Sequence, residues 1–358
     1  MSVEVRLFKA FSGFSNIPRV PTEADRLINQ FKVDSSSNNS SIVFSGIIDS
    51  FDITIIANGE FENILPGMTF ESLQPFNTNS FLSSQDVYVN GQLWETNNFT
   101  SPISVKLAAG ITLSELSTLY AGNDVVYAPN IKARESGIDF FGYAGNDRFY
   151  AYGSHEYDDV FHGGDGIDSV IYSSSISNFN ITASNNIWDP TTQVAESVGY
   201  FIRDNSGRDG DVQVTGVERL VFSDAAVAFD VFGTAGKAYR IYEAVLGRAP
   251  DLEGLGYWIN DMDNGVSLTT IAQGFIASAE FTRKYGANPS YDTYINLLYQ
   301  NILGRAPDAE GLKYWVSNMQ KGIDSPAVVL ASFSEGFENK ANVAPDIAGG
   351  IFYTPWIS

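Results

Sequence analysis

Short apolar runs alternate with turn-forming residues over the N-terminal third of the chain, from Ile42 to Leu107. The runs recur at intervals of roughly 8 to 12 residues, which is typical of antiparallel β-sandwiches and related modules. A break between runs is expected at Asn58-Gly59, and Asn90-Gly91 predicts a two-residue β-hairpin. We therefore expect a β-rich, sandwich-like module over residues 1–118, with one capped helix between Thr22 and Phe31.

The hydrophobic period becomes helical beyond Gly236, and the sequence there repeats itself. The hexapeptide Leu246–Asp251 returns as Leu303–Asp308, an offset of 303 − 246 = 57 residues, and 13 of the 21 positions from Leu246 to Val266 match their copy. One such unit could not easily bury its own apolar face, so the pattern predicts a duplicated all-helical domain over 233–345 and a tail over 346–358. Three helices are expected in each copy; in the first they are Tyr239–Gly247, Pro250–Asn264 and Ser267–Tyr285.

Between these regions the chain is rich in glycine and aspartate. Gly163–Ile171 fits the nonapeptide G-G-x-G-x-D-x-U-x, where U is a large apolar residue, at every specified position. Gly142–Tyr150 fits except that Tyr143 replaces the second glycine, and weaker relatives begin at Gly122, Gly137 and Gly153. Glycine permits the backbone angles of a tight turn, and the aspartate with the turn carbonyls can bind a hard cation. The apolar residue after the aspartate should enter a strand that faces the core.

These repeats predict a Ca²⁺ site, because Ca²⁺ takes about 6 to 8 oxygen ligands and needs carboxylates among them. The alternative is that they are Gly/Asp turns of an ordinary β-meander, which form without any ion. Successive aspartates are 8, 11 and 10 residues apart, so the repeat is irregular and one to three ions are expected. The candidate ligand positions are Asp124, Asp139, Gly145, Asp147, Asp158, Gly164, Gly166 and Asp168.

Composition narrows the classes of partner. The chain has 42 acidic and 21 basic residues, a formal net charge of −21, which repels nucleic acids and attracts cations. It has no cysteine, which excludes disulfides and thiolate metal sites. No apolar stretch is long enough to span a membrane, and the first residues lack the features of a cleaved signal peptide. We therefore expect neither a nucleic-acid partner nor a membrane span.

No catalytic motif is present in the sequence. It contains no H-E-x-x-H, no G-x-S-x-G and no phosphate-binding loop. His155 and His162 are the only histidines, and both are expected at exposed loop positions rather than as metal ligands. The chain is therefore expected not to be an enzyme, although a pair of carboxylates acting as a glycosidase would need no local motif.

The glycine- and aspartate-rich segment resembles the RTX family of secreted Ca²⁺-binding proteins, whose repeats form a parallel β-roll. This resemblance implies a roll with a closing β segment over residues 119–232. It also implies that each ion lies between loops two repeats apart, so that Asp139 would share an ion with Asp158 and Asp147 with Asp168. The duplicated helical region is similar to an uncharacterised helical domain family that recurs near the C-termini of RTX-type exoproteins and surface-layer proteins.

The resemblance implies a multidomain β plus α protein that works outside the cell. It would leave by type I secretion, fold on binding Ca²⁺, and either self-assemble at the cell surface, as in a surface layer or matrix fibre, or act in adhesion. Its expected partners are calcium, further copies of itself or a cell-surface polysaccharide. The competing interpretation is a secreted hydrolase whose catalytic part is the N-terminal module.

Overall fold

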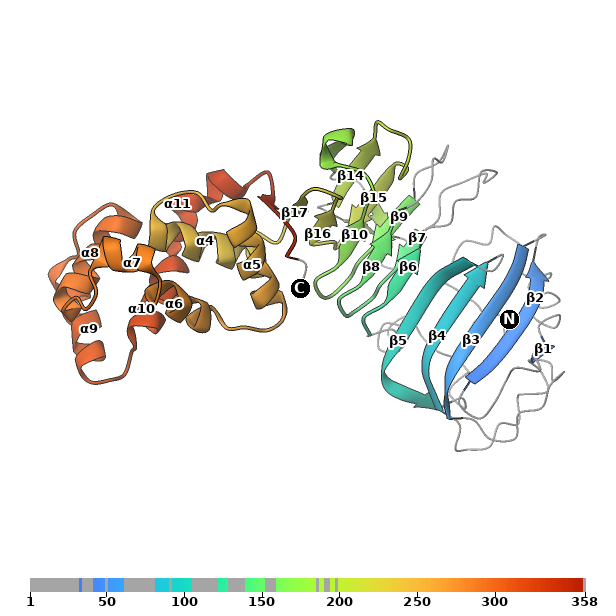
Figure 1. Cartoon of the computed structure of the whole chain (residues 1–358), viewed down its shortest axis with the longest axis horizontal. Helices are drawn as coiled ribbons and strands as arrows, with labels where there is room; N and C mark the ends of the chain where they lie inside the picture. The colour runs from blue at the N-terminus through green and yellow to red at the C-terminus, as the bar shows by residue number, and fades with distance from the viewer. Residues whose placement is uncertain are drawn as a thin grey trace. The chain divides into compact units, whose positions relative to one another are not determined.

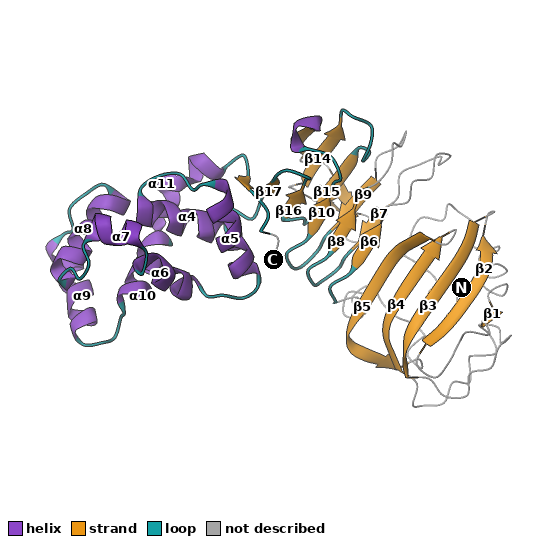
Figure 2. Ribbon diagram, in the orientation of Figure 1, coloured by secondary structure: helices purple, strands orange, loops and turns teal. Residues whose placement is uncertain are grey.

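The computed structural model describes residues 32–33, 41–48, 51–60, 81–89, 92–104, 122–127, 139–151, 159–184, 187–189, 194–196 and 199–356 (Figure 1). The chain divides into two compact units, Met1–Ser223 and Asp224–Ser358. The described part of the first unit is built from β-strands and one short 3-10 helix, and the second unit contains eight α-helices (Figure 2). The expected β plus α organisation is confirmed. No helix among the described residues is long and apolar enough to cross a membrane.

The N-terminal strands form an antiparallel sheet in chain order. They are β1 Lys32–Val33, β2 Ser41–Ile48, β3 Phe51–Glu60, β4 Phe81–Val89 and β5 Gln92–Ser104. Val89 pairs with Gln92, which confirms the hairpin predicted at Asn90-Gly91. The break expected at Asn58-Gly59 was wrong, because both residues lie inside β3, where a shift of register absorbs them as an irregularity. The helix expected between Thr22 and Phe31 lies outside the described residues.

After β5 the chain alternates between two parallel sets of strands. One set contains β6 Val125–Tyr127, β8 Arg148–Tyr150, β10 Ser169–Ile171 and β16 Arg219–Val221. The other contains β7 Asp139–Phe141, β9 Asp159–His162 and β15 Val212–Thr215. In the first set Val125, Arg148, Ser169 and Arg219 stand in register. Residues that directly precede these strands are therefore brought to one edge of the sheet.

In the first parallel set the core is formed by the apolar residues two positions after the repeat aspartates. Phe149 and Val170, each two positions after an aspartate, have no exposed surface, as the nonapeptide predicts. The rings of Phe149 and Phe161 lie 5.0 Å apart, so residues from the two sets of strands pack against each other. Burial of these side chains stabilises the strands by roughly 1.5–3 kcal/mol each.

Residues 172–218 separate β10 from β16 and extend the second sheet. Strand β11 Phe179–Ser184 pairs with β14 Gly199–Asp204, and β14 pairs with β15, both antiparallel. Between β11 and β14, β12 Ile187–Asp189 and β13 Val194–Glu196 pair with each other. The 3-10 helix Ile176–Asn178 precedes β11. The insertion therefore returns the chain to the first sheet in register with β10, so that β16 occupies the place of the next repeat.

The second unit consists of two copies of four helices. The helices are α4 Thr234–Leu246, α5 Leu252–Asp263, α6 Leu268–Ile276, α7 Ala279–Tyr285, α8 Tyr291–Leu303, α9 Ala309–Gln320, α10 Pro326–Ser334 and α11 Phe337–Ile347. The third helix expected in the first copy is two helices, because the Ser278 side chain accepts the Phe281 N–H and starts α7. Within the expected C-terminal tail, β18 Ile351–Tyr353 pairs with β17 Ala226–Ala228.

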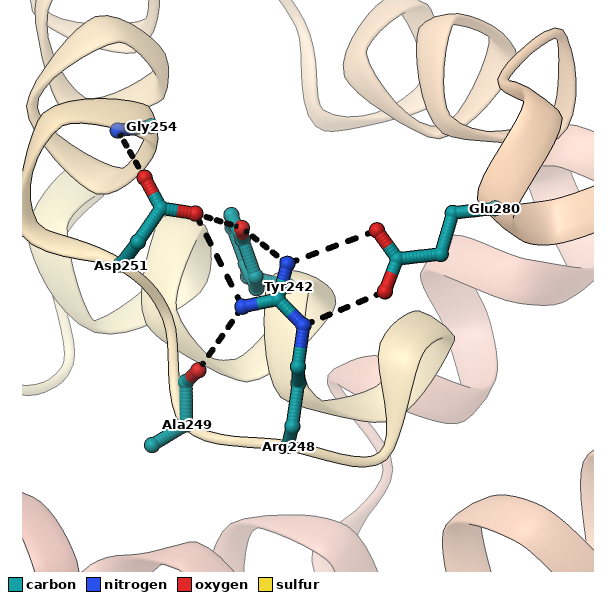
Figure 3. A network of polar contacts seen from close by, with 6 residues as sticks. All are labelled: Tyr242, Arg248, Ala249, Asp251, Gly254 and Glu280. Atoms are coloured by element: carbon teal, nitrogen blue, oxygen red, sulfur yellow. Dashed lines mark hydrogen bonds and ion pairs between the residues drawn. The ribbon is translucent and has the colours of Figure 1, made fainter.

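The repeated hexapeptide forms the turn between the first two helices of each copy. Asp251 caps α5 by accepting the Gly254 N–H at 2.8 Å, so the helix begins at Leu252 and not at Pro250 as expected. Arg248 lies over the Tyr242 ring, 5.1 Å from its centroid, and its guanidinium also contacts Glu280 on α7 (Figure 3). The second copy repeats the arrangement: Arg305 lies over the Tyr299 ring and contacts Glu338. The motif therefore joins the first and last helices of each copy.

Replacing Arg248 by lysine should lower the free energy of unfolding of the helical unit by about 1 kcal/mol. Lysine keeps the charge but cannot make the planar, two-pronged contact with Glu280 while lying on Tyr242. Urea unfolding followed by tryptophan fluorescence would measure the change. Arg283→Lys, at an exposed position of α7, is the matched control. Equal effects of the two substitutions would show that the turn does not depend on this contact.

Candidate metal site

Four acidic residues occupy the same place in the fold, directly before a strand of the first parallel set. Asp124 precedes β6, Asp147 precedes β8, Asp168 precedes β10 and Glu218 precedes β16. Because these strands are parallel and in register, the four residues form a line along one edge of the sheet. We call them the carboxylate row. The first three were predicted as ligand positions from the sequence.

Hydrogen bonds connect each member of the carboxylate row to the next. The Asp124 N–H donates to Asp147 Oδ1 at 2.7 Å, and the Asp147 N–H donates to Asp168 Oδ1 at 2.8 Å. The Asp168 N–H donates in turn to Glu218 Oε2 at 2.8 Å. Each of these carboxylates therefore uses one oxygen to hold the backbone of the preceding coil.

The second oxygens of Asp147 and Asp168 are buried. Both side chains have no exposed surface, and within the described part of the chain neither Oδ2 atom has a hydrogen-bond partner. Burial raises the pKa of Asp147 and that of Asp168 to about 7 from the usual 3.8. A buried carboxylate oxygen without a donor is costly, and a bound cation is one way to remove that cost.

A carbonyl oxygen accompanies each of these two atoms. A Cβ added to Gly142 would lie 2.1 Å from Asp147 Oδ2 and 2.6 Å from the Gly163 carbonyl oxygen. A Cβ added to Gly163 would lie 2.6 Å from Asp168 Oδ2 and 2.0 Å from the Gly216 carbonyl oxygen. The absence of a side chain at the first glycine of each repeat thus lets a carboxylate oxygen of the same loop and a carbonyl oxygen of the next coil lie close together beside it. A side chain at either position would collide with both oxygens.

The remaining repeat glycines let the loops stack closely. Gly164 and Gly166 have φ angles of +106° and +143°, and Gly145 has +127°, in the range that favours glycine. A Cβ on Gly164 would come within 2.0 Å of the Tyr143 carbonyl oxygen, and one on Gly166 within 1.7 Å of the Gly145 carbonyl oxygen. Tyr143, where the nonapeptide has glycine, also takes a left-handed φ of 68°. These glycines therefore set the spacing of the loops.

The donor set fits a hard divalent cation such as Ca²⁺. All its members are oxygens, from aspartate carboxylates and turn carbonyls, and Ca²⁺ prefers such ligands. Within the described ranges, no three or more His, Cys, Asp or Glu side chains gather at one point as a metal site. An ion beside Asp147 or Asp168 would consequently take most of its ligands from backbone carbonyls and water.

The other predicted pair of aspartates, Asp139 and Asp158, is described only in part. Asp158 lies outside the described residues, and for Asp139 the structure gives the backbone, which begins β7. In that strand Asp139 stands opposite Val160 of β9, two positions beyond Asp158. Sharing of an ion by Asp139 and Asp158 therefore stays a prediction. Asp147 and Asp168, by contrast, are joined directly by a hydrogen bond.

The position expected for His162 was wrong. It lies in β9, is 6% exposed, and its ring stacks on Phe141 with the centroids 4.4 Å apart. Its Nδ1 atom is 2.9 Å from the Thr215 hydroxyl oxygen. The neighbouring Phe161 packs against Phe149 of the other set of strands, so the alternation of β9 places His162 on the opposite face, where it contacts Phe141 and Thr215, the residues in register with it. His155 lies outside the described residues.

A second acidic segment, Asp204–Asp211, forms a turn that is held by its own side chains. Asp204 accepts hydrogen bonds from the backbone N–H groups of Arg208 and Asp209. Asp209 accepts the Ser173 hydroxyl and the Ser174 N–H, which ties the turn to the end of β10. These carboxylates therefore serve to order the insertion.

Glu218 was not predicted, although the sequence contained a signal for it. In Asp147-Arg148-Phe149 and Asp168-Ser169-Val170 an acid is followed, two positions later, by a large buried residue. Glu218-Arg219-Leu220 has the same pattern, and Leu220 has no exposed surface. The long insertion before it and the change from aspartate to glutamate hid this relation.

Comparison with known proteins concerns the helical unit. Residues 238–276 and 272–343 each match a domain of unknown function, DUF4214. No curated protein matches the chain. The duplication seen in the sequence is therefore a duplication of a described family, whose function is not known. The chain carries a DUF4214 domain, present in two copies, in its C-terminal region.

Proposed function

We propose that this protein binds Ca²⁺ at the carboxylate row and that the ion stabilises the fold of the parallel β region. One observation carries the proposal: the buried Oδ2 atoms of Asp147 and Asp168 have no hydrogen-bond partner among the described residues, yet each lies close to a carbonyl oxygen beside a repeat glycine. Simple Gly/Asp turns do not need buried carboxylates. The resemblance of the repeats to RTX proteins agrees with this chemistry.

Calcium would also neutralise charge that the fold brings together. Asp124, Asp147 and Asp168 are nearly or wholly buried in one line, in a chain whose formal net charge is −21. Ionised carboxylates in such a line repel one another and lose their hydration. An ion that binds only the folded state adds its binding free energy to folding.

The wider role that we propose is that of an extracellular structural protein. At the low Ca²⁺ concentration of a cytosol the carboxylate row would stay without ions, and at extracellular concentrations it would fill, so that export and folding are coupled. Support for this setting comes from the RTX-like repeats and from the acidic composition. Self-assembly at the cell surface, or adhesion to a surface polysaccharide, is the proposed use of the folded chain.

Thermal unfolding with Ca²⁺ and with a chelator tests the calcium proposal. We expect the wild-type β region to melt several degrees higher in millimolar Ca²⁺, with no such change in Mg²⁺, whose smaller ion demands stricter geometry. Gly142→Ala is the sharpest variant, because its methyl group would collide with Asp147 Oδ2 and with the Gly163 carbonyl oxygen and so displace both proposed ligands. Gly349→Ala, at an exposed glycine of the helical unit where an added Cβ meets nothing within 4 Å, is the control for the substitution itself. A melting temperature that is the same in Ca²⁺ and chelator would refute the proposal.

Light scattering during Ca²⁺ addition tests the wider role. An assembling protein should form large particles as the ion is added, whereas an adhesin should stay monomeric. A chain that stays monomeric from micromolar to millimolar Ca²⁺ removes the support for self-assembly.

A further inference from the structure

We propose that the turn Gly216–Glu218 completes a second cation site, together with Asp168. This inference rests on the proposed calcium binding and extends it to residues outside the nonapeptide repeats. The site would take Ca²⁺ between the Gly163–Asp168 loop and the turn that enters β16. In the first site, by comparison, the ion would lie between the Gly142–Asp147 and Gly163–Asp168 loops.

The backbone places Glu218 as the next member of the row after Asp168. Its Oε2 accepts the Asp168 N–H at 2.8 Å, as Asp168 Oδ1 accepts the Asp147 N–H at 2.8 Å. The Asp168 carbonyl oxygen accepts the N–H groups of Glu218 and Arg219 at 3.1 and 2.9 Å. Glu218 is thereby fixed opposite Asp168 from both sides.

The Gly216 carbonyl oxygen occupies the position in the second site that the Gly163 carbonyl oxygen occupies in the first, one coil earlier. Thr215 stands opposite His162 in the parallel ladder, so Gly216 follows β15 as Gly163 follows β9. The Gly163 carbonyl converges with Asp147 Oδ2, and the Gly216 carbonyl converges with Asp168 Oδ2. Asp168 Oδ2 is fully buried and has no hydrogen-bond partner in the described part of the chain. The pair of oxygens that marks the first site therefore recurs.

The second site differs from the first in the length of its closing turn. Six residues, 163–168, connect β9 to β10, whereas three residues, 216–218, connect β15 to β16. A shorter turn offers fewer carbonyl oxygens to an ion, and the extra methylene of glutamate lets its carboxylate reach across the shorter connection. The second site should therefore depend on Glu218 for its charge and bind Ca²⁺ more weakly than the first.

Calorimetric titration of the full chain with Ca²⁺ tests this inference. We expect wild type to show two classes of ion beside these loops, and Glu218→Gln to weaken the weaker class at least tenfold while the stronger class is unchanged. Glutamine keeps an oxygen that can accept the Asp168 N–H, so the effect reports on charge and not on loss of that hydrogen bond. Asp147→Asn should do the reverse. Glu253→Gln, at an exposed position of α5, controls for the change in net charge.

The outcomes separate this inference from the calcium proposal itself. Wild type that binds no Ca²⁺ overturns both. Glu218→Gln that binds Ca²⁺ as wild type does, while Asp147→Asn loses an ion, overturns the second site and leaves the first. If circular dichroism in chelator shows that Glu218→Gln has lost its fold, Glu218→Asp takes its place. Aspartate keeps the charge, but its side chain is one methylene shorter and cannot reach across the turn. We expect it to weaken Ca²⁺ binding at the weaker class of site as Glu218→Gln does. Wild-type binding by that variant contradicts the inference.

Discussion

At pH 8, Ca²⁺ should raise the melting temperature of the β region far more than at pH 5. Burial raises the pKa of Asp147 and of Asp168 to about 7, so at pH 5 both carboxyls are protonated in the folded protein and bind a cation poorly. At pH 8 both are ionised. For one site at a Ca²⁺ concentration 100-fold above its dissociation constant, the gain is about 2.7 kcal/mol. In a domain of this size that corresponds to roughly 2–4 °C for each kcal/mol.

Without metal the pH dependence should have the opposite sign. A carboxyl whose pKa is higher in the folded than in the unfolded state binds more protons when folded, at every pH between about 4 and about 7. The stability contributed by Asp147 and Asp168 is therefore complete below pH 4 and is lost as the pH rises through 7. Melting curves in chelator across this range would show the loss as a falling melting temperature.

The double variant Asp147→Asn/Asp168→Asn isolates these two groups from the other carboxylates. Asparagine has nearly the same shape and carries no charge, so the variant should be more stable than wild type in chelator at pH 8. It should also show no response to Ca²⁺ and a flatter pH dependence between 4 and 7. A Ca²⁺ response of equal size at pH 5 and pH 8, or one retained by the variant, would contradict the assignment of the site.

Short sequence patterns predicted those features of the fold that are determined by residues close together in the chain. The nonapeptide indicated the buried Phe149 and Val170, because an alternating strand turns every second side chain toward the core. The resemblance to RTX proteins implied that Asp147 and Asp168 would come together, and a hydrogen bond joins them. The hairpin at Asn90-Gly91 was predictable because two residues specify the turn.

The features that could not be predicted from the sequence depend on contacts between residues that lie far apart in the chain. Glu218 joins the carboxylate row only because the insertion over residues 172–218 adds strands to the second sheet and brings β16 back beside β10. No spacing rule covers an excursion of this length. His162 was misjudged because its position in β9, and not its polarity, decides that it lies against Phe141. Ser278 ended a helix that the hydrophobic period alone would continue.

The ion pair between the two helical copies is another contact that could not be predicted from the sequence. Arg240 on α4 is 2% exposed and makes two contacts with Glu335, from Nε at 2.7 Å and from Nη2 at 2.9 Å. Its Nη1 donates to the Val231 carbonyl oxygen at 2.6 Å. The position equivalent to Arg240 in the second copy, 57 residues later, is Leu297, so the repeat itself gives no hint of the pair.

Glu335→Ala should therefore be among the most damaging substitutions in the helical unit. It removes the only carboxylate shown in contact with the Arg240 guanidinium among the described residues, and it leaves a buried charge, which costs roughly 3–5 kcal/mol. Lys340 also contacts Glu335, at 3.1 Å, but is 39% exposed, so Lys340→Ala should cost less than about 1 kcal/mol. Urea unfolding followed by the fluorescence of Trp258 and Trp315 would measure both.

A double substitution distinguishes loss of the pair from loss of packing. Arg240→Met/Glu335→Leu replaces both charges by apolar groups of similar length, and such replacements of buried ion pairs are often neutral or stabilising. We expect the double variant to recover most of the stability that Glu335→Ala loses. If instead Glu335→Ala costs no more than Lys340→Ala, the guanidinium finds other partners or water, and the contact between α4 and the end of α10 is not what holds the two copies of the domain together.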